Sequence, residues 1–179
     1  MLLCQQPGND SLNKGRRFVL FLAKPKKILF VCTGNTCRSP MAEVIFRKMA
    51  EEADYQWLID SAGIHAATGA RATFEAVEVL KGLKLDVSGH SARQLTAEIL
   101  EDADLVLTMT VSHKRSIQME FPSVAAKVFT IKEYAGKTEE LDIHDPYGCG
   151  LEVYQRVANE LQADLALIWK RLAAEREAN

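Results

Sequence analysis

Apolar residues along the chain fall into short continuous runs and into longer stretches with helical spacing. The short runs are rich in β-branched and aromatic residues, which predicts buried strands, and the longer stretches predict amphipathic helices. The predicted strands are Lys27–Cys32, Trp57–Ser61, Leu105–Met109 and Val128–Ile131. The predicted helices are Pro40–Ala53, Thr73–Leu83, a short one through Ile99 and Leu100, Val111–Phe121 and Leu151–Glu177. Strands that alternate with helices indicate an α/β fold with a parallel sheet covered on both faces.

The segment Gly136–Gly150 breaks this alternation, because it is long, polar and without periodicity. Such a segment between a sheet and a final helix is either a functional loop or a disordered one.

Composition and charge divide the chain unevenly. Six of its 22 Lys and Arg residues lie in the first 27 residues, where Asp10 is the single acid. The remaining residues, 28–179, hold 16 basic and 23 acidic side chains, a net charge of −7. An acidic body argues against nucleic acid as a partner. With 179 residues, 47% of them hydrophobic, the chain suits one globular domain, which we expect to span residues 26–179.

Residues 1–25 are expected to form a disordered N-terminal extension or to lie upstream of the true translation start. The apolar run FVLFLA at 18–23 follows KGRR and hints at a signal peptide. Six residues are a short apolar core, however, and KPKK is a poor cleavage site. A membrane-tethering role for this extension is the alternative. No run reaches membrane-spanning length, so no membrane partner is expected.

The four cysteines show no repeated spacing, which argues against a disulfide framework. A reduced, cytoplasmic setting is therefore expected.

Polar chemistry is concentrated directly after the first predicted strand. Gly34 can turn the chain tightly, and Asn35 tolerates left-handed geometry. Ser39 followed by Pro40 is a helix-start pattern, a capping hydroxyl before a proline that needs no N–H. The loop from Thr33 to Arg38 is thus expected to curl onto a helix N-terminus, where backbone N–H groups form an anion cradle.

Cys32 and Arg38 would make this cradle reactive. A helix N-terminus and a nearby guanidinium both lower the pKa of a cysteine, and the thiolate is the nucleophile. The planar fork of arginine suits two oxygens of a phosphoryl group. The Ser39 hydroxyl can donate to the thiolate and stabilise it as a leaving group. Together these residues indicate a covalent phosphatase site.

Other interpretations of the loop fit less well. A dinucleotide-binding loop needs G-x-G-x-x-G and a nucleotide-binding loop needs G-x-x-x-x-G-K-[ST], and the sequence has neither. A zinc site would need further ligands that no neighbouring Cys or His supplies. A purely structural Cys32 would explain the motif alone, but not the strand before it and the helix start after it.

The motif VCTGNTCRSPMAE at 31–43 resembles the signature of the low-molecular-weight protein phosphatases. The resemblance extends over about residues 26–175 and includes DSAG at 60–63, GHSARQLT at 89–96, ADLVLTM at 103–109 and DPYG at 145–148. It implies a four-stranded parallel sheet with helices on both faces, no metal or other cofactor, and a phosphocysteine intermediate. Phosphorylated proteins would be the substrates and inorganic phosphate the product.

The resemblance also implies roles for single residues. Cys32 matches the nucleophile and Arg38 the phosphate-binding arginine. Asp145 matches the general acid, although the residues alone leave surface exposure as an alternative for it. Asn35, Ser61 and His90 match a polar network that supports the loop; without the resemblance, His90 would be interpreted as an ordinary surface histidine. The phosphate-binding residues would be Thr33, Gly34, Asn35, Thr36, Cys37 and Arg38.

Two positions bear on the substrate. Tyrosine-specific members usually carry an aliphatic residue where this chain has Thr36. Many of them also have a second aromatic residue where this chain has Gly148, so Tyr147 alone remains as an aromatic wall of the substrate cleft. The bacterial protein-arginine phosphatases share the threonine, and KVFTIKEY at 127–134 also resembles that branch. Phosphoarginine is therefore the expected substrate and phosphotyrosine the alternative. Arsenate reductases share the fold but need further cysteines, which residues 85–105 lack.

Cys37 admits two interpretations. A second thiol in the same loop as a reactive thiolate suits reversible oxidation through a Cys32–Cys37 disulfide. Cys37 is equally well explained as a small apolar filler.

Overall fold

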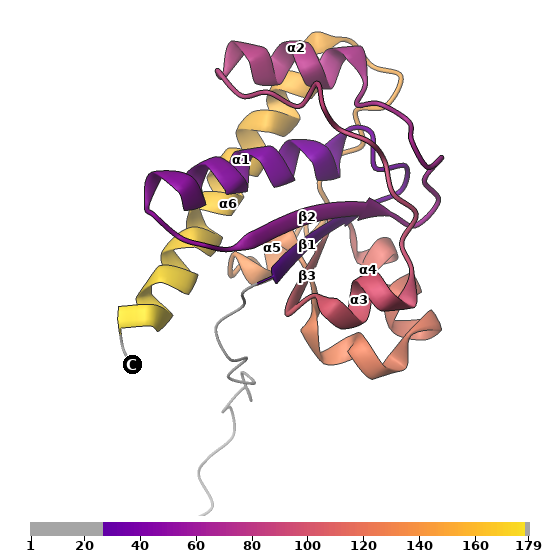
Figure 1. The fold of residues 1–179 in the computed structure, drawn as a ribbon, viewed down its shortest axis with the longest axis vertical. Helices are drawn as coiled ribbons and strands as arrows, with labels where there is room; N and C mark the ends of the chain where they lie inside the picture. Colours follow the sequence, from indigo (N-terminus) through magenta and orange to yellow (C-terminus); the bar gives the residue numbers. More distant parts are fainter. Residues whose placement is uncertain (1–26, 178–179) are drawn as a thin grey trace, which may run out of the picture.

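The computed structural model describes the backbone of residues 27–177 and the side chains of residues 27–174. Four strands, β1 (Lys27–Cys32), β2 (Leu58–Gly63), β3 (Leu105–Thr108) and β4 (Val128–Thr130), form one parallel sheet in the order β2-β1-β3-β4. The expected four-stranded parallel sheet is confirmed. Because β1 lies inside the sheet, its carboxyl end opens between those of β2 and β3 (Figure 1).

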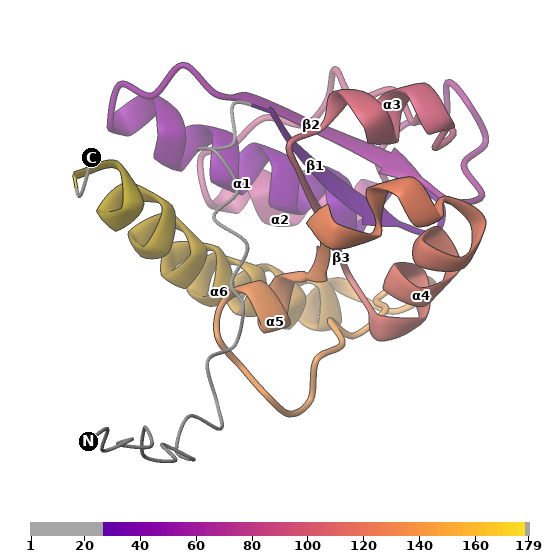
Figure 2. The ribbon, with the colours of Figure 1, turned by 90° about the horizontal axis from the view of Figure 1, so that it is seen from below.

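Helices cover both faces of the sheet (Figure 2). One face is covered by α1 (Arg38–Glu52), α5 (Ile131–Tyr134) and α6 (Leu151–Glu177), and α2 (Phe74–Gly82) packs on α1 and α6 as part of the same core. The other packs against α3 (Ala97–Asp102), α4 (Val111–Glu120) and the 3₁₀ helix η1 (Pro122–Lys127). Alternate side chains of β1 belong to the two cores, with Ile28 and Phe30 in the first and Leu29 and Val31 in the second. This alternation follows from the period of two along a strand.

Several predicted element boundaries need correction. Helix α1 begins at Arg38, two residues before the predicted start, so the cap position falls on Cys37 rather than on Ser39. Strand β2 runs two residues beyond the prediction, because Ala62 and Gly63 pair with the end of β1. The fourth strand stops at Thr130, and Ile131 begins helix α5 instead. Thr130 and Glu133 form a capping box in which each side chain accepts from the other's backbone N–H. This T-x-x-E pattern favours a helix start over a longer strand.

The predicted N-terminal extension, with its signal-like run, lies outside the described residues. Within residues 27–177, no helix is long and apolar enough to span a membrane.

Candidate active site

The loop after β1 turns back sharply before helix α1 begins at Arg38. Asn35 takes a left-handed backbone conformation, with φ at 55°, and its N–H points to the Cys32 sulfur at 3.2 Å. The end of β2 approaches this loop so closely that a Cβ on Gly63 would lie 2.6 Å from the Thr33 carbonyl oxygen. Since real Cβ atoms do not approach backbone this closely, only glycine fits there. The cradle expected from the sequence therefore has its predicted shape, and Gly63 is an additional requirement for it.

The Cys32 thiol lies at the base of this curl and is 97% buried. Its sulfur is 2.9 Å from the Ser39 hydroxyl, in the first turn of α1. That first turn contains no acidic residue. The positive end of the helix dipole therefore acts on the sulfur without a carboxylate to compensate it.

A buried polar network centred on Asn35 supports the loop. The Asn35 amide nitrogen donates to the hydroxyls of Ser39, at 2.9 Å, and of Ser61, at 2.8 Å. Its backbone carbonyl lies 2.7 Å from Nε2 of His90. The structure thus brings together the three support residues that the sequence predicted, from the loop, from β2 and from the segment after α2.

Two further residues belong to this network and were not predicted. The backbone N–H of Arg93 donates to the Asn35 side-chain oxygen at 2.9 Å, and its guanidinium donates to the Ser61 carbonyl. Glu43 of α1 accepts the Ser61 hydroxyl and pairs with Arg47. Arg93 lies within the GHSARQLT motif, so its nearness to His90 was the available signal.

Arg38 is almost fully buried, and its guanidinium is bound by residues of the loop before α6. One terminal nitrogen donates to the Asp145 carboxylate at 2.7 Å, and the other donates to the Ile143 carbonyl at 3.3 Å. Its Nε is buried and has no partner among the described residues. The guanidinium therefore keeps a donor free for an anion in the cradle.

Asp145 reaches Arg38 because its loop is anchored on both sides. The Ile143 N–H donates to the Met109 carbonyl, and the Val111 N–H at the start of α4 donates to the Asp142 carboxylate, each at 2.7 Å. The segment expected to be a functional or disordered loop is thus fixed at the sheet edge. Asp145 itself stays half exposed, and its carboxylate accepts a hydrogen bond from the backbone N–H of Tyr147. The Tyr147 side chain is 73% exposed.

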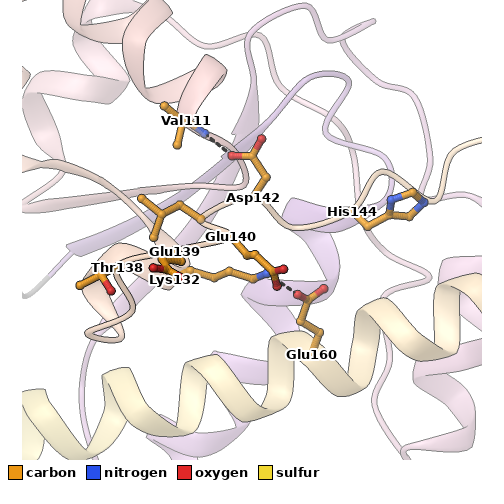
Figure 3. A pocket seen from close by; sticks show the side chains of 9 residues that line it. Val111, Lys132, Thr138, Glu139, Glu140, Asp142, His144 and Glu160 are labelled. Carbon is orange, nitrogen blue, oxygen red and sulfur yellow. Dashed lines mark hydrogen bonds and ion pairs between the residues drawn. The ribbon is translucent and has the colours of Figure 1, made fainter.

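A hollow of about 670 Å³ lies on this loop. Figure 3 shows the side chains that line it. Asp142 and His144 line it together with Lys132, which forms an ion pair with Glu160 at 2.6 Å. None of the cradle residues 32–38 lines this hollow, so it is separate from Cys32.

Cys37 points away from the cradle into the core. Its sulfur lies 3.2 Å from the hydroxyl of Tyr154 on α6, which also accepts from the Thr73 hydroxyl. Burial and the contact with Cys37 raise the pKa of Tyr154 above its usual value. Both Cys32 and Cys37 are free thiols. Thr36 of the same loop is half-buried, and its carbonyl accepts from the Thr73 N–H at 2.9 Å.

His113 is a residue of the site that sequence reasoning missed. Its Nε2 lies 2.9 Å from the Thr33 hydroxyl, and its Nδ1 lies 2.9 Å from the hydroxyl of Thr110. Burial first, and then the charge of Arg38, lower the pKa of His113 to about 4. The ring is therefore neutral near pH 7.

Among the described residues, no group of three or more His, Cys, Asp or Glu side chains is placed to hold a metal ion. The chemistry available to the site is that of a buried thiol, a guanidinium and a carboxylate around one anion cradle.

Comparison with known proteins points to the same chemistry. A protein-arginine-phosphatase of Bacillus subtilis is 42% identical over 149 residues, which cover 83% of this chain and 98% of that protein. A solved low molecular weight protein tyrosine phosphatase from T. tengcongensis is 48% identical, with a TM-score of 0.77 and coverage of 81% of this chain and 98% of that one.

A third relative carries information on the reaction. It is a solved cysteine-to-serine mutant of the YwlE arginine phosphatase with a phosphorylated active-site serine, 40% identical, with a TM-score of 0.80 and coverage of 86% of this chain and 99% of that one. The model of the low molecular weight phosphotyrosine protein phosphatase family matches residues 27–178. With a match over nearly the whole described chain and relatives at about 40% identity, this protein belongs to the low molecular weight phosphotyrosine protein phosphatase family.

Proposed function

We propose that this phosphatase removes phosphate from phosphoarginine in proteins, with Cys32 as its nucleophile. The observation that carries the choice of phosphoarginine is Thr36, a half-buried hydroxyl in the cradle where tyrosine-specific members usually have an aliphatic side chain. A guanidinium keeps several N–H donors that need acceptors once water is removed, and a threonine oxygen can supply one. The similarity to the B. subtilis protein-arginine-phosphatase supports this choice.

The first chemical step breaks the phosphorus–nitrogen bond. In this proposal the Cys32 thiolate attacks phosphorus while Arg38 and the backbone N–H groups of the cradle bind the phosphoryl oxygens. Asp145, which takes up a proton from solvent once the phosphoryl group has displaced it from Arg38, gives that proton to the departing guanidino nitrogen. The Ser39 hydroxyl, 2.9 Å from the sulfur, stabilises the thiolate before attack and as the later leaving group.

The second step hydrolyses the phosphocysteine. Asp145, now a carboxylate, takes a proton from water, which attacks phosphorus and releases inorganic phosphate and the Cys32 thiolate. The phosphorylated serine in the mutant relative supports a covalent intermediate at this position.

The ion pair between Arg38 and Asp145 fits these roles. Without substrate, the carboxylate at 2.7 Å balances the guanidinium charge. A bound phosphoryl group would compete for the same nitrogen and release Asp145 toward the leaving group. The half-exposed position of Asp145 leaves room for that movement.

Phosphotyrosine is the second candidate substrate. The T. tengcongensis relative, at 48% identity, is described as a tyrosine phosphatase. Tyr147 on the Asp145 loop is an exposed aromatic side chain that would suit a substrate ring as well as a guanidinium plane.

Two finer properties complete the proposal. We infer a cytoplasmic location from the cysteine pattern, and reversible oxidation of the Cys32 thiol. A Cys32–Cys37 disulfide would require the Cys37 sulfur to leave the Tyr154 hydroxyl and turn toward the cradle. Treatment with peroxide and then with thiol reductant should inactivate and restore the enzyme. Mass spectrometry that found no Cys32–Cys37 crosslink in the oxidised protein would contradict the disulfide.

The substrate is tested by measuring kcat/KM on a phosphoarginine peptide and a matched phosphotyrosine peptide. Wild type should prefer phosphoarginine, and Thr36→Ile should move the selectivity ratio toward phosphotyrosine. A buried polar group left unpaired costs about 1–3 kcal/mol, so the ratio should move by about 5- to 150-fold. Thr36→Val is the matched control, because it removes the hydroxyl while it keeps the branched shape.

Preference of wild type for phosphotyrosine would replace the first candidate with the second. A ratio that Thr36→Ile leaves unchanged would show that Thr36 does not determine the substrate.

A further inference from the structure

Thr33 and His113 are 80 residues apart in the sequence and lie side by side in the structure. Thr33 follows the nucleophile directly and is exposed, whereas His113 belongs to the first turn of α4. The two side chains meet at 2.9 Å, from His113 Nε2 to Thr33 Oγ1. This contact is not part of the network that supports Asn35.

The His113 ring is fixed in its orientation. Its Nδ1 lies 2.9 Å from the Thr110 hydroxyl, and its backbone N–H donates to the same oxygen at 3.2 Å. Because both ring nitrogens have hydroxyl partners, the imidazole cannot turn without losing a hydrogen bond. A neutral imidazole donates from one nitrogen and accepts at the other, so it can satisfy one hydroxyl in each way.

The partner contact restricts what the Thr33 hydroxyl can do. Whichever ring nitrogen carries the proton, one hydrogen-bonding position of Thr33 is taken by His113. A hydroxyl has one proton and two lone pairs, so at least one lone pair remains as an acceptor. Since Thr33 is exposed and directly follows Cys32, that acceptor is open to solvent beside the Cys32 sulfur's loop.

The charges around His113 place this pair beside the catalytic groups. The charges of Arg38 and Asp145 both act on the ring, together with those of Asp142 and His65. Burial keeps the ring uncharged, so His113 adds no positive charge to this edge of the cradle. A guanidinium leaving group at this edge of the cradle would face a neutral ring and a hydroxyl oxygen rather than a second positive charge.

We propose that Thr33 accepts a hydrogen bond from the leaving group of the substrate and that His113 is the positioning residue that orients Thr33 for this contact. The inference rests on the proposed phosphoarginine activity. A guanidino leaving group offers N–H donors next to phosphorus, whereas a tyrosyl ring offers carbon edges. The contact should therefore contribute to selectivity and act mainly on KM, because the hydrogen bond is made on binding.

The test is a double-mutant cycle with Thr33→Val, His113→Phe and the combined variant. Each single variant should raise KM on a phosphoarginine peptide more than on a phosphotyrosine peptide, so that the selectivity ratio falls by about 2- to 12-fold, the usual scale of one hydrogen bond. The combined variant should lose no more selectivity for phosphoarginine than Thr33→Val alone, because His113 acts through Thr33. His113→Gln, which is neutral and keeps both a donor and an acceptor, should restore part of the selectivity.

Controls separate this role from a general effect on the fold. Met119→Ala changes an 82% exposed residue of the same helix and should leave the ratio at the wild-type value. The melting temperature of every variant identifies loss of the fold. If His113→Phe fails to fold, His113→Gln takes its place in the comparison.

The inference would be overturned if each variant raised KM equally on both peptides. It would also be overturned if the effects of Thr33→Val and His113→Phe on the selectivity ratio added up in the combined variant. If wild type hydrolyses phosphoarginine and the variants keep the wild-type selectivity, this inference is overturned and the proposed function stands. Wild type with no turnover of phosphoarginine would overturn the proposed function as well.

Discussion

Asn35 tests how the cradle is held, because one buried side chain joins three segments of the chain. It makes three side-chain hydrogen bonds, to the hydroxyls of Ser39 and Ser61 and from the Arg93 N–H, and it is fully buried. Each such bond contributes about 0.5–1.5 kcal/mol net, so their loss should cost about 2–5 kcal/mol. Asn35→Ala adds about 1–2 kcal/mol, because φ is 55° and alanine is strained in the left-handed region.

Asn35→Ala should therefore lower the free energy of unfolding by about 3–7 kcal/mol, a large share of the ~5–15 kcal/mol that is typical of a native protein. Asn35→Gly is the matched control, because it removes the same hydrogen bonds without the strain. Glycine loses more chain entropy on folding, which offsets part of this difference, so the glycine variant should be more stable than the alanine variant by at least ~0.5 kcal/mol.

Urea unfolding measures these differences through the fluorescence of Trp57 and Trp169, whose partly buried rings lie 5.3 Å apart against the core. kcat/KM should fall in both variants, because the Asn35 N–H and the Ser39 hydroxyl would no longer be held against the Cys32 sulfur. The reasoning is refuted if Asn35→Ala unfolds within ~0.5 kcal/mol of wild type, or if Asn35→Gly is the less stable of the two.

Three further outcomes follow from the geometry. Asp145→Asn should lower the rate on poor leaving groups by about 10²–10⁴-fold, and an equal loss on a leaving group that needs no proton would show that Asp145 only binds substrate. Gly63→Ala should sharply reduce kcat/KM, because its Cβ would meet the Thr33 carbonyl at 2.6 Å; wild-type activity in this variant would contradict the close approach. His113 has a lowered pKa of about 4, so the unfolded chain binds its proton more readily and the free energy of unfolding should fall as the pH drops from 6.5 toward 4. Unfolding at several pH values should show a smaller fall for His113→Gln, and identical slopes would contradict a neutral buried ring.

The sequence predicted the sheet and the cradle because their signals are local. A continuous apolar run is what a strand buried on both faces requires, and Ser39 before Pro40 marks the start of α1 within a residue or two. The end of β4 was placed one residue too late because Ile131 suits a strand and a helix equally. Only the pairing of Thr130 with Glu133 decides between them.

The contacts that complete the site could not be read from local patterns. Arg93 meets Asn35 across 58 residues, His113 meets Thr33 across 80, and Tyr154 meets Cys37 across 117. Each is set by how segments far apart in the sequence pack together in the fold rather than by spacing along the chain. His90 and Asp145 were identified only through the family resemblance, and their residue types alone are ordinary for a protein surface.

The central claim is that Cys32 takes phosphate from phosphoarginine, and rapid quenching of wild type with a phosphoarginine peptide tests it most directly. Mass spectrometry of the quenched enzyme should find phosphate on the Cys32 sulfur in the first turnover, formed faster than with a matched phosphotyrosine peptide. Phosphate released from phosphoarginine without this adduct, or an adduct that forms only with phosphotyrosine, would contradict the account.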